Sequence, residues 1–313
     1  MTAASRTGTA MIFPGMGPTP FADVGKFMVI NPFARKLIAT ADRVLGYSLL
    51  ERYRTTEGDY SEYAQVAFML NSLALAEWAG HTLGVEADLC TGPSFGEKPA
   101  AAFSGALDFA DAVRATAGFA RLLEDYFSAE FKDLVTHSFV RVPEDKLREV
   151  LAELDERGET YEISCYIDDD FHMLTLREHN LDWLKPRLRS LGGMSLYSMR
   201  PPMHCSAFAG LRERAEEEVF GPLEFADPRL PIVADQDGAL ITTGEGVRTM
   251  LLDSCVRPMR WPAVVDALLG AGVTTVCVAG QDSLFGRVRR TTANFEVVPV
   301  TPRTALLPRP ART

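Results

Sequence analysis

A serine between two glycines is the residue pattern in this chain best suited to covalent chemistry. The pentapeptide Gly92-Pro93-Ser94-Phe95-Gly96 fits G-x-S-x-G, the turn that lifts a serine nucleophile off the end of a strand. Residues 85–91 predict a short buried strand before it, and the alanine-rich residues 97–103 predict a helix after it. Glycine suits so sharp a turn because a Cβ there would clash. We therefore expect Ser94 to be a nucleophile at a helix N-terminus.

A serine hydroxyl needs a base to take its proton, and histidine is the usual one. His204 is our candidate, because it follows Pro201-Pro202-Met203 at the junction of two predicted domains, where a base can face a cleft. The other histidines are expected to be packed, solvated or at a helix end: His81, His137, His172 and His179.

The elements that must position this pair alternate between strand and helix. We expect strands at 10–13, 85–91, 232–234 and 274–278, and helices at 31–50, 63–83, 97–103, 108–126 and 262–269. Such alternation predicts an α/β fold with a mostly parallel sheet between helices.

The order changes in the middle of the chain to β-α-β-β-α-β, the ferredoxin-like split motif. The strands are expected at 134–142, 161–167, 171–177 and 194–199, and the helices at 143–157 and 181–191. We therefore predict a large domain in two parts, 1–130 and 200–313, with an inserted ferredoxin-like subdomain at 131–199. The tail from Thr301 is expected to be mobile or to cross the surface.

Composition excludes several classes of protein. The 313 residues are 47% hydrophobic and 24% charged, as in globular proteins, and a net charge of −10 argues against nucleic-acid binding. The five cysteines lack CxxC spacing, so they indicate neither a disulfide framework nor a metal site. No signal peptide or membrane-spanning run is apparent. We expect a cytoplasmic protein without a metal.

Several motifs together resemble the malonyl-CoA:acyl-carrier-protein acyltransferases. Residues 92–123 resemble the family's GHSLGE segment and the DFADAVR helix after it, and Phe13-Pro14-Gly15-Met16-Gly17 resembles its FPGQG loop. Met203-His204-Cys205 resembles its catalytic-histidine motif. Weaker matches lie at Gln65, at 258–261 and at 278–286. The resemblance covers nearly the whole chain and implies an α/β-hydrolase-like large domain with a ferredoxin-like insertion.

The resemblance also implies roles for these residues. Ser94 would be acylated by a thioester, and His204 would act as general base and then as general acid. A backbone carbonyl near Arg260 would orient the histidine. The backbone N–H groups of Met16 and Phe95 would form the oxyanion hole, which does not depend on the side chain at position 16.

The chain departs from the family where the acyl group binds. The malonyl-loading members carry an arginine five residues after the arginine of DFADAVR, and the corresponding residue here is Phe119. A phenyl ring offers a carboxylate no bidentate partner, and burying an unpaired carboxylate is costly. The alternative is a shifted register in which Arg121 does this work. Met16, Phe95, Phe119 and Met203 would together make a more apolar acyl site, which suits a non-carboxylated group. The residues expected to line the acyl pocket are Gln65, Phe119, Phe171, Met203 and Arg260.

We therefore predict a ping-pong acyltransferase that moves an acyl group between acyl carrier proteins. In length and in its departures the chain is similar to a dipeptidyl-transferring branch of the family, which acts in macrolactam antibiotic biosynthesis. This similarity implies an aminoacyl or dipeptidyl group, passed from a discrete carrier to the loading-module carrier domain of a polyketide synthase. Asp168, Asp169 and Asp170 are expected to form a solvated turn, or one of them meets an amino group on the acyl chain. The alternatives are a hydrolase that clears carrier proteins and a non-catalytic carrier-binding module.

The expected partner surface is local, because the chain itself is acidic and the family's carrier proteins present an acidic helix. No cofactor is expected, since the carrier's phosphopantetheine arm delivers the substrate, and a monomer is expected. The proposed carrier contacts are Arg141, Met194, Arg287, Arg289 and Arg290.

Overall fold

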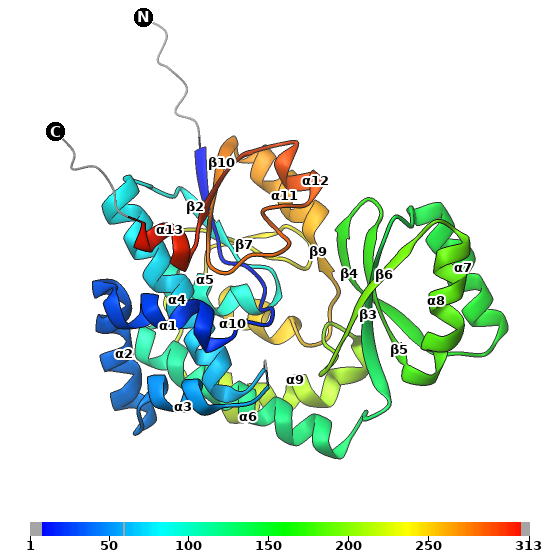
Figure 1. Ribbon diagram of the computed structural model, residues 1–313, viewed down its shortest axis with the longest axis horizontal. Helices are drawn as coiled ribbons and strands as arrows, with labels where there is room; N and C mark the ends of the chain where they lie inside the picture. Colours follow the sequence, from blue (N-terminus) through cyan, green and yellow to red (C-terminus); the bar gives the residue numbers. More distant parts are fainter. Residues whose placement is uncertain (1–7, 59, 308–313) are drawn as a thin grey trace, which may run out of the picture.

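The computed structural model describes residues 8–58 and 60–307, which form a large α/β unit and a smaller one beside it (Figure 1). The described part of the large unit contains a six-stranded sheet in the order β11-β10-β1-β2-β7-β8. Its pairs are parallel except the last, β7 with β8. The strands are β1 (Gly8–Ile12), β2 (Leu89–Thr91), β7 (Ile232–Val233), β8 (Leu240–Ile241), β10 (Val273–Ala279) and β11 (Glu296–Val300).

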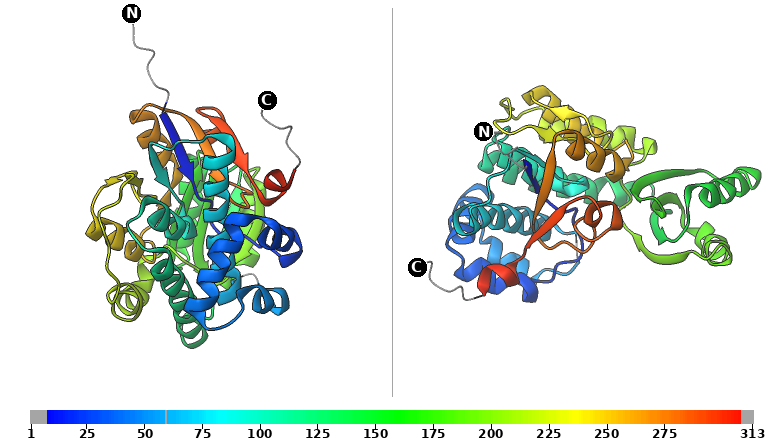
Figure 2. Two further views of the ribbon diagram at one scale, coloured as in Figure 1. Left: turned by 90° about the vertical axis from the view of Figure 1, so that its left-hand side faces the viewer. Right: turned by 90° about the horizontal axis from the view of Figure 1, so that it is seen from above.

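Helices surround this sheet, as Figure 2 shows from two further directions. Helix α4 (Glu62–Trp78) is buried on nearly all sides, which suits its run of Ala, Val, Leu, Phe and Met. Before the small unit the other helices are α1 (Phe21–Ile30), α2 (Pro32–Leu45), α3 (Leu49–Thr55), α5 (Glu97–Ser104) and α6 (Phe109–Ala129). After it come α9 (Ala209–Ala215), α10 (Gly244–Asp253), α11 (Trp261–Gly270), α12 (Arg289–Thr292) and α13 (Pro302–Leu306).

The small unit has its own five-stranded sheet in the order β6-β3-β5-β4-β9. Four strands fall within the predicted insertion: β3 (Leu134–Val140), β4 (Tyr161–Asp168), β5 (Phe171–Arg177) and β6 (Met194–Met199). The fifth, β9 (Met259–Arg260), comes from the large unit and pairs in parallel with β4. The small sheet therefore includes a strand that lies outside the insertion in sequence.

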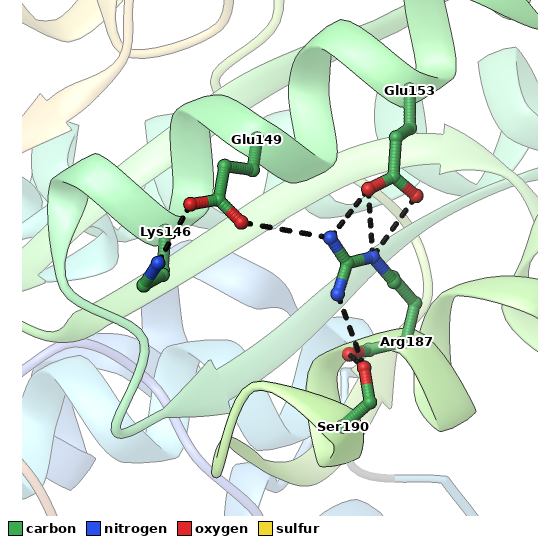
Figure 3. A network of polar contacts seen from close by, with 5 residues as sticks. All are labelled: Lys146, Glu149, Glu153, Arg187 and Ser190. Carbon is green, nitrogen blue, oxygen red and sulfur yellow. Dashed lines mark hydrogen bonds and ion pairs between the residues drawn. The ribbon is translucent and has the colours of Figure 1, made fainter.

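Two helices cover one face of the small sheet, α7 (Glu144–Glu156) and α8 (Leu181–Ser190). They are joined by Arg187, whose guanidinium makes a multidentate pair with Glu153 and reaches Glu149 at 3.7 Å (Figure 3). The apolar positions of α7 (Leu147, Val150 and Leu154) pack with those of α8 in a core separate from that of the large unit. Pro186 lies inside α8.

Three local expectations differ from the structure. The segment 31–50 contains two helices rather than one, because Gly46 ends α2 in the left-handed conformation (φ 76°) and Ser48 caps α3. The predicted strand 85–91 is strand only from Leu89. The tail begins with α13, which starts at a capping box formed by Thr301 and Thr304, whereas residues 308–313 lie outside the described residues.

Candidate active site

Ser94 lies on the sharp turn between β2 and α5, with a left-handed φ of 54°. Both flanking glycines are required by close backbone contacts. A Cβ on Gly92 would lie 1.9 Å from the Gly96 oxygen, and one on Gly96 would lie 2.0 Å from the Phe13 oxygen. The second contact also places the loop after β1, which carries Met16, directly against the turn. The residues that could form an oxyanion hole, Met16 and Phe95, therefore sit on two adjoining loops.

His204 meets Ser94 directly, with its Nε2 2.8 Å from the serine Oγ. The histidine belongs to the segment between β6 and α9 and also has a left-handed φ, of 60°. Its exposure is 1%, whereas Ser94 is partly exposed. A buried base hydrogen-bonded to an accessible hydroxyl is the arrangement that nucleophilic catalysis by serine requires.

Burial, together with the positive charge of Lys98, lowers the pKa of His204 to about 4. The imidazole is therefore neutral at neutral pH and free to accept the serine proton. Backbone carbonyls of Arg257 and Ser254 oppose the pKa shift, but in the described residues Nδ1 has no partner at hydrogen-bonding geometry. Both carbonyls belong to the segment that leads up to Arg260.

Asp235 supports the turn that carries Ser94 through a hydrogen bond, a role that the sequence did not reveal. Its Oδ2 accepts a hydrogen bond from the Ser94 N–H at 2.5 Å. Burial raises the pKa of Asp235 to about 6 and raises that of its neighbour Glu97 well above the usual range, with the charge of Asp235 as a second cause for Glu97. Both carboxyl groups therefore hold a proton more readily than ordinary ones, and Asp235, with a pKa of about 6, is mainly ionised at neutral pH. The only available signal was its place just after the predicted strand 232–234.

Glu162 on β4 ties the small unit to the histidine loop, a second role that sequence patterns missed. Its carboxylate accepts from the Ser206 N–H at 3.0 Å and from the Ser206 hydroxyl at 2.7 Å. The Cys205 thiol lies 3.4 Å from the same oxygen. A strand of the insertion therefore fixes Cys205 and Ser206, the two residues that follow His204.

The residues expected to bind the acyl group divide into two groups. Phe95 and Phe119 are buried and both lie beside the Lys98 ammonium, and Met203 packs beside the same core. The contacts of the other three are with other residues. Gln65 donates to the Tyr60 carbonyl at 2.8 Å, Phe171 packs in the second core with Ile167 and Trp261, and the Arg260 guanidinium lies 4.3 Å over the Tyr166 ring.

Arg121 does not replace the missing family arginine. Its side chain is 60% exposed and pairs with Glu62 at 2.9 Å, whereas Phe119 is only 4% exposed. The structure therefore turns Phe119 into the interior and Arg121 towards solvent.

The expected carrier contacts are arranged along one end of the small sheet. Strand pairing aligns Met194 with Val140, Val140 with Phe171, and Phe171 with Asp168. Asp168 then accepts a hydrogen bond from the Arg290 N–H at 3.0 Å, so it is buried and not part of a wholly solvated turn. Arg141 follows Val140 and is exposed, as are Arg287 and Arg289, whereas the Arg290 side chain is paired with Asp266. Asp169 and Asp170 are exposed at the same end.

The described residues lack both a helix that could span a membrane and a cluster of side chains that could hold a metal ion. None of their helices combines the length and apolarity needed to span a membrane. They also contain no cluster of three or more His, Cys, Asp or Glu side chains arranged to hold a metal ion.

Known proteins similar to this chain share its fold along most of its length. A family model described as the VinK acyltransferase small domain matches residues 138–199. The chain is 23% identical over 301 residues to malonyl CoA-acyl carrier protein transacylase of Bacillus subtilis, covering 93% of this chain and 73% of the relative.

Two solved structures show the same architecture. The malonyl-CoA:acyl-carrier-protein transacylase of Streptococcus pneumoniae superposes with a TM-score of 0.82 at 23% identity, covering 95% of this chain and 97% of that one. A type II polyketide malonyl-transacylase in complex with its acyl-carrier protein gives 0.83 at 20% identity, covering 96% and 99%. The fold is therefore an α/β-hydrolase-like large domain with a ferredoxin-like small domain, as expected from the sequence.

Proposed function

We propose that this chain, which resembles the malonyl-CoA:acyl-carrier-protein transacylases over most of its length, transfers acyl groups between carrier thiols through an ester on Ser94. The contact of 2.8 Å between Ser94 Oγ and His204 Nε2, at a turn that only glycine neighbours permit, is the observation that supports this most directly.

The proposed reaction has two symmetrical halves. Ser94 Oγ attacks the thioester carbonyl while its proton passes to His204 Nε2, and the backbone N–H groups of Phe95 and Met16 donate to the developing oxyanion. The C–S bond then breaks, and the leaving sulfur takes the proton from His204. A second carrier thiol gives its proton to the histidine, attacks the ester and releases Ser94. The phosphopantetheine arm brings each thiol, and the proposal includes no bound cofactor and a monomeric enzyme.

We further propose a non-carboxylated acyl group, aminoacyl or dipeptidyl, moved from a discrete carrier to a polyketide synthase carrier domain. Two observations support this finer assignment. Phe119 is buried where an arginine would bind a carboxylate, and Arg121 points elsewhere. The match of residues 138–199 to the VinK small domain links the chain to a distinct acyltransferase group.

Mass spectrometry of the intact protein tests the proposal. The enzyme is incubated with dipeptidyl, aminoacyl and malonyl pantetheine thioesters, and Ser94→Ala is the matched control. We expect the dipeptidyl or aminoacyl mass on the natural enzyme, none on Ser94→Ala, and little malonyl. Phe119→Arg should increase malonyl loading. Acylation of Ser94→Ala at another residue would overturn the nucleophile, and efficient malonyl loading of the natural enzyme would overturn the acyl assignment.

The same experiment separates transfer from hydrolysis. If the acyl-enzyme persists in buffer and disappears when a carrier thiol is added, the chain is a transferase. Decay in buffer alone, at a rate that exceeds transfer, would instead identify a hydrolase, because water and a thiol attack the same ester.

A further inference from the structure

Lys98 places an ammonium group between the nucleophile turn and Phe119. It lies in the first turn of α5, and its Nζ is 4.8 Å from the ring centroid of Phe95 and 4.6 Å from that of Phe119. Phe95 directly follows Ser94. Phe119 occupies the position at which the resemblance implies an acyl-binding arginine. A cation is therefore present beside the acyl site although the arginine is absent.

The amine of Lys98 is surrounded by apolar groups and has unused donors. Burial lowers the pKa of Lys98 to about 8, against the opposing influence of Cys255 and Glu97, so it is mainly charged at neutral pH. In the described part of the chain it makes no ion pair, and the phenyl faces attract a cation without accepting conventional hydrogen bonds. The described residues show no hydrogen bond between Lys98 and Glu97, whose Oε1 accepts from Gln236 and whose Oε2 has no partner at hydrogen-bonding geometry.

The side chain remains reachable, since Lys98 is partly exposed while its helix neighbours Pro99, Ala100 and Ala101 are buried. A lysine that served only to fill the core would lose hydration without gaining a partner, which is unfavourable. An oxygen atom of a bound ligand would satisfy the donors that the protein leaves open.

We propose that Lys98 is a specificity-determining residue whose ammonium donates a hydrogen bond to an oxygen on the acyl chain beyond the thioester carbonyl. This inference rests on the proposed acyl transfer at Ser94. An amide carbonyl of a dipeptidyl group supplies such an oxygen, and a carboxylate would supply the same chemistry. A free aminoacyl group carries its own ammonium close to the thioester and would be repelled, so the dipeptidyl group is favoured.

The test compares Lys98→Met, which keeps the length of the side chain but removes the donor, with the natural enzyme. The kcat/KM of Ser94 acylation is measured for dipeptidyl, malonyl and butyryl pantetheine thioesters. We expect the ratio of dipeptidyl to butyryl to fall by about tenfold to a hundredfold, as for loss of a hydrogen bond to a charged group. Lys36→Met, which changes an exposed lysine on α2, is the matched control and should leave every ratio unchanged.

The outcomes separate this inference from the proposed function. If the malonyl-to-butyryl ratio falls instead, Lys98 does bind an acyl oxygen, but the non-carboxylated assignment is wrong. If kcat/KM falls equally for all three thioesters, Lys98 acts on the fold or the dyad, and the inference is overturned. If kcat/KM falls for none of them, Lys98 binds no acyl oxygen, and the inference is likewise overturned. Should Lys98→Met fail to fold, Lys98→Gln tests the same ratio, because it keeps a polar group but removes the charge.

Discussion

His204 combines burial with a neighbouring cation, and both keep the imidazole neutral where an ordinary histidine begins to titrate. Its pKa is lowered from 6.5 to about 4, first by desolvation and then by Lys98. The neutral form accepts the Ser94 proton, and the protonated form cannot. Lys98 is the charged group that lowers this pKa, and the backbone carbonyls of Arg257 and Ser254 oppose the shift.

We expect the acylation rate to remain high as the pH falls from 7 towards 6, where an unperturbed histidine would already be losing activity. The loss should come at lower pH, as His204 takes up its proton. In Lys98→Met the pKa of His204 should rise, because the repelling charge is gone, and the acid limb should move to higher pH. Single-turnover acylation with a butyryl thioester between pH 4 and 8 measures both limbs.

His204 and Asp235 also make the free energy of unfolding depend on pH, and the two dependences have opposite signs. His204 binds a proton less well in the folded state, so its contribution to stability is lost as pH falls from 6.5 to about 4. Asp235 binds a proton better when folded, so its contribution falls as pH rises from 3.8 to about 6. Thermal unfolding at each pH must therefore accompany the rate measurement. An acid limb near 6.5 in a fully folded enzyme would contradict the neutral-histidine interpretation.

At the scale of elements, a strand of the small unit positions the loop that carries the base. Glu162 on β4 accepts two hydrogen bonds from Ser206, two residues after His204. The left-handed φ of His204 makes this loop strained, so neighbouring contacts must hold it. The insertion thus contributes to the geometry of the dyad without touching the serine.

Glu162→Ala should lower kcat by about tenfold to a hundredfold, because small displacements of a catalytic group are costly. KM for a small pantetheine thioester should change little, since the hydrogen bonds of Glu162 in the described residues are to Ser206 and Cys205 rather than to an acyl-site residue. Glu162→Gln keeps one acceptor oxygen and should recover part of the rate. An equal loss in both variants, together with a lowered unfolding temperature, would show that Glu162 serves the fold rather than the histidine loop.

The sequence predicted regular elements better than it predicted contacts. Strand β5 was predicted at its observed bounds because the turn at residues 169–170 precedes it, and helix α7 was close because its apolar spacing is clear. The break between two helices in 31–50 was missed because the apolar spacing remains helical on both sides of Gly46 and Ser48, where the chain turns. Ser94 and His204 came from local motifs. Asp235, Glu162 and Lys98 act through partners distant in sequence, so no local pattern reveals them.

Across the whole molecule, the exposed carrier-contact candidates align at one end of the small sheet. Met194 is 44% exposed, and Arg141 stands beside its pairing partner Val140. Arg287 and Arg289 lie on the opposite side of this end of the sheet. The neighbouring Arg290 places them there, because its N–H donates a hydrogen bond to Asp168 at the end of β4. Three strand spacings separate the two groups by roughly 15 Å, a span that one carrier helix can cover.

We predict that Arg141→Ala and Arg287→Ala each weaken transfer to carrier proteins while acylation from a small pantetheine thioester is preserved. The reason is that both guanidinium groups are exposed and neither takes part in the proposed chemistry at Ser94, and added salt should mimic the loss. Arg35→Ala, an exposed arginine on α2, is the matched control. Steady-state transfer with both substrate types measures the effect. Equal losses on carrier and small thioester would place these arginines in the chemistry or the fold.

The pairing of β4 with β9 limits how this protein can be recombined with its relatives. Cys165 aligns with Met259, and Tyr166 with Arg260, so the small sheet is completed by residues encoded far downstream of it. A chimaera that exchanges only the contiguous insertion would bring a foreign β4 against the resident β9. The Arg260 N–H also donates to the Asp235 carbonyl, so a misfit there would reach the residue that supports Ser94. Exchangeable modules in this architecture are therefore discontinuous, and their boundaries follow the sheet rather than the chain.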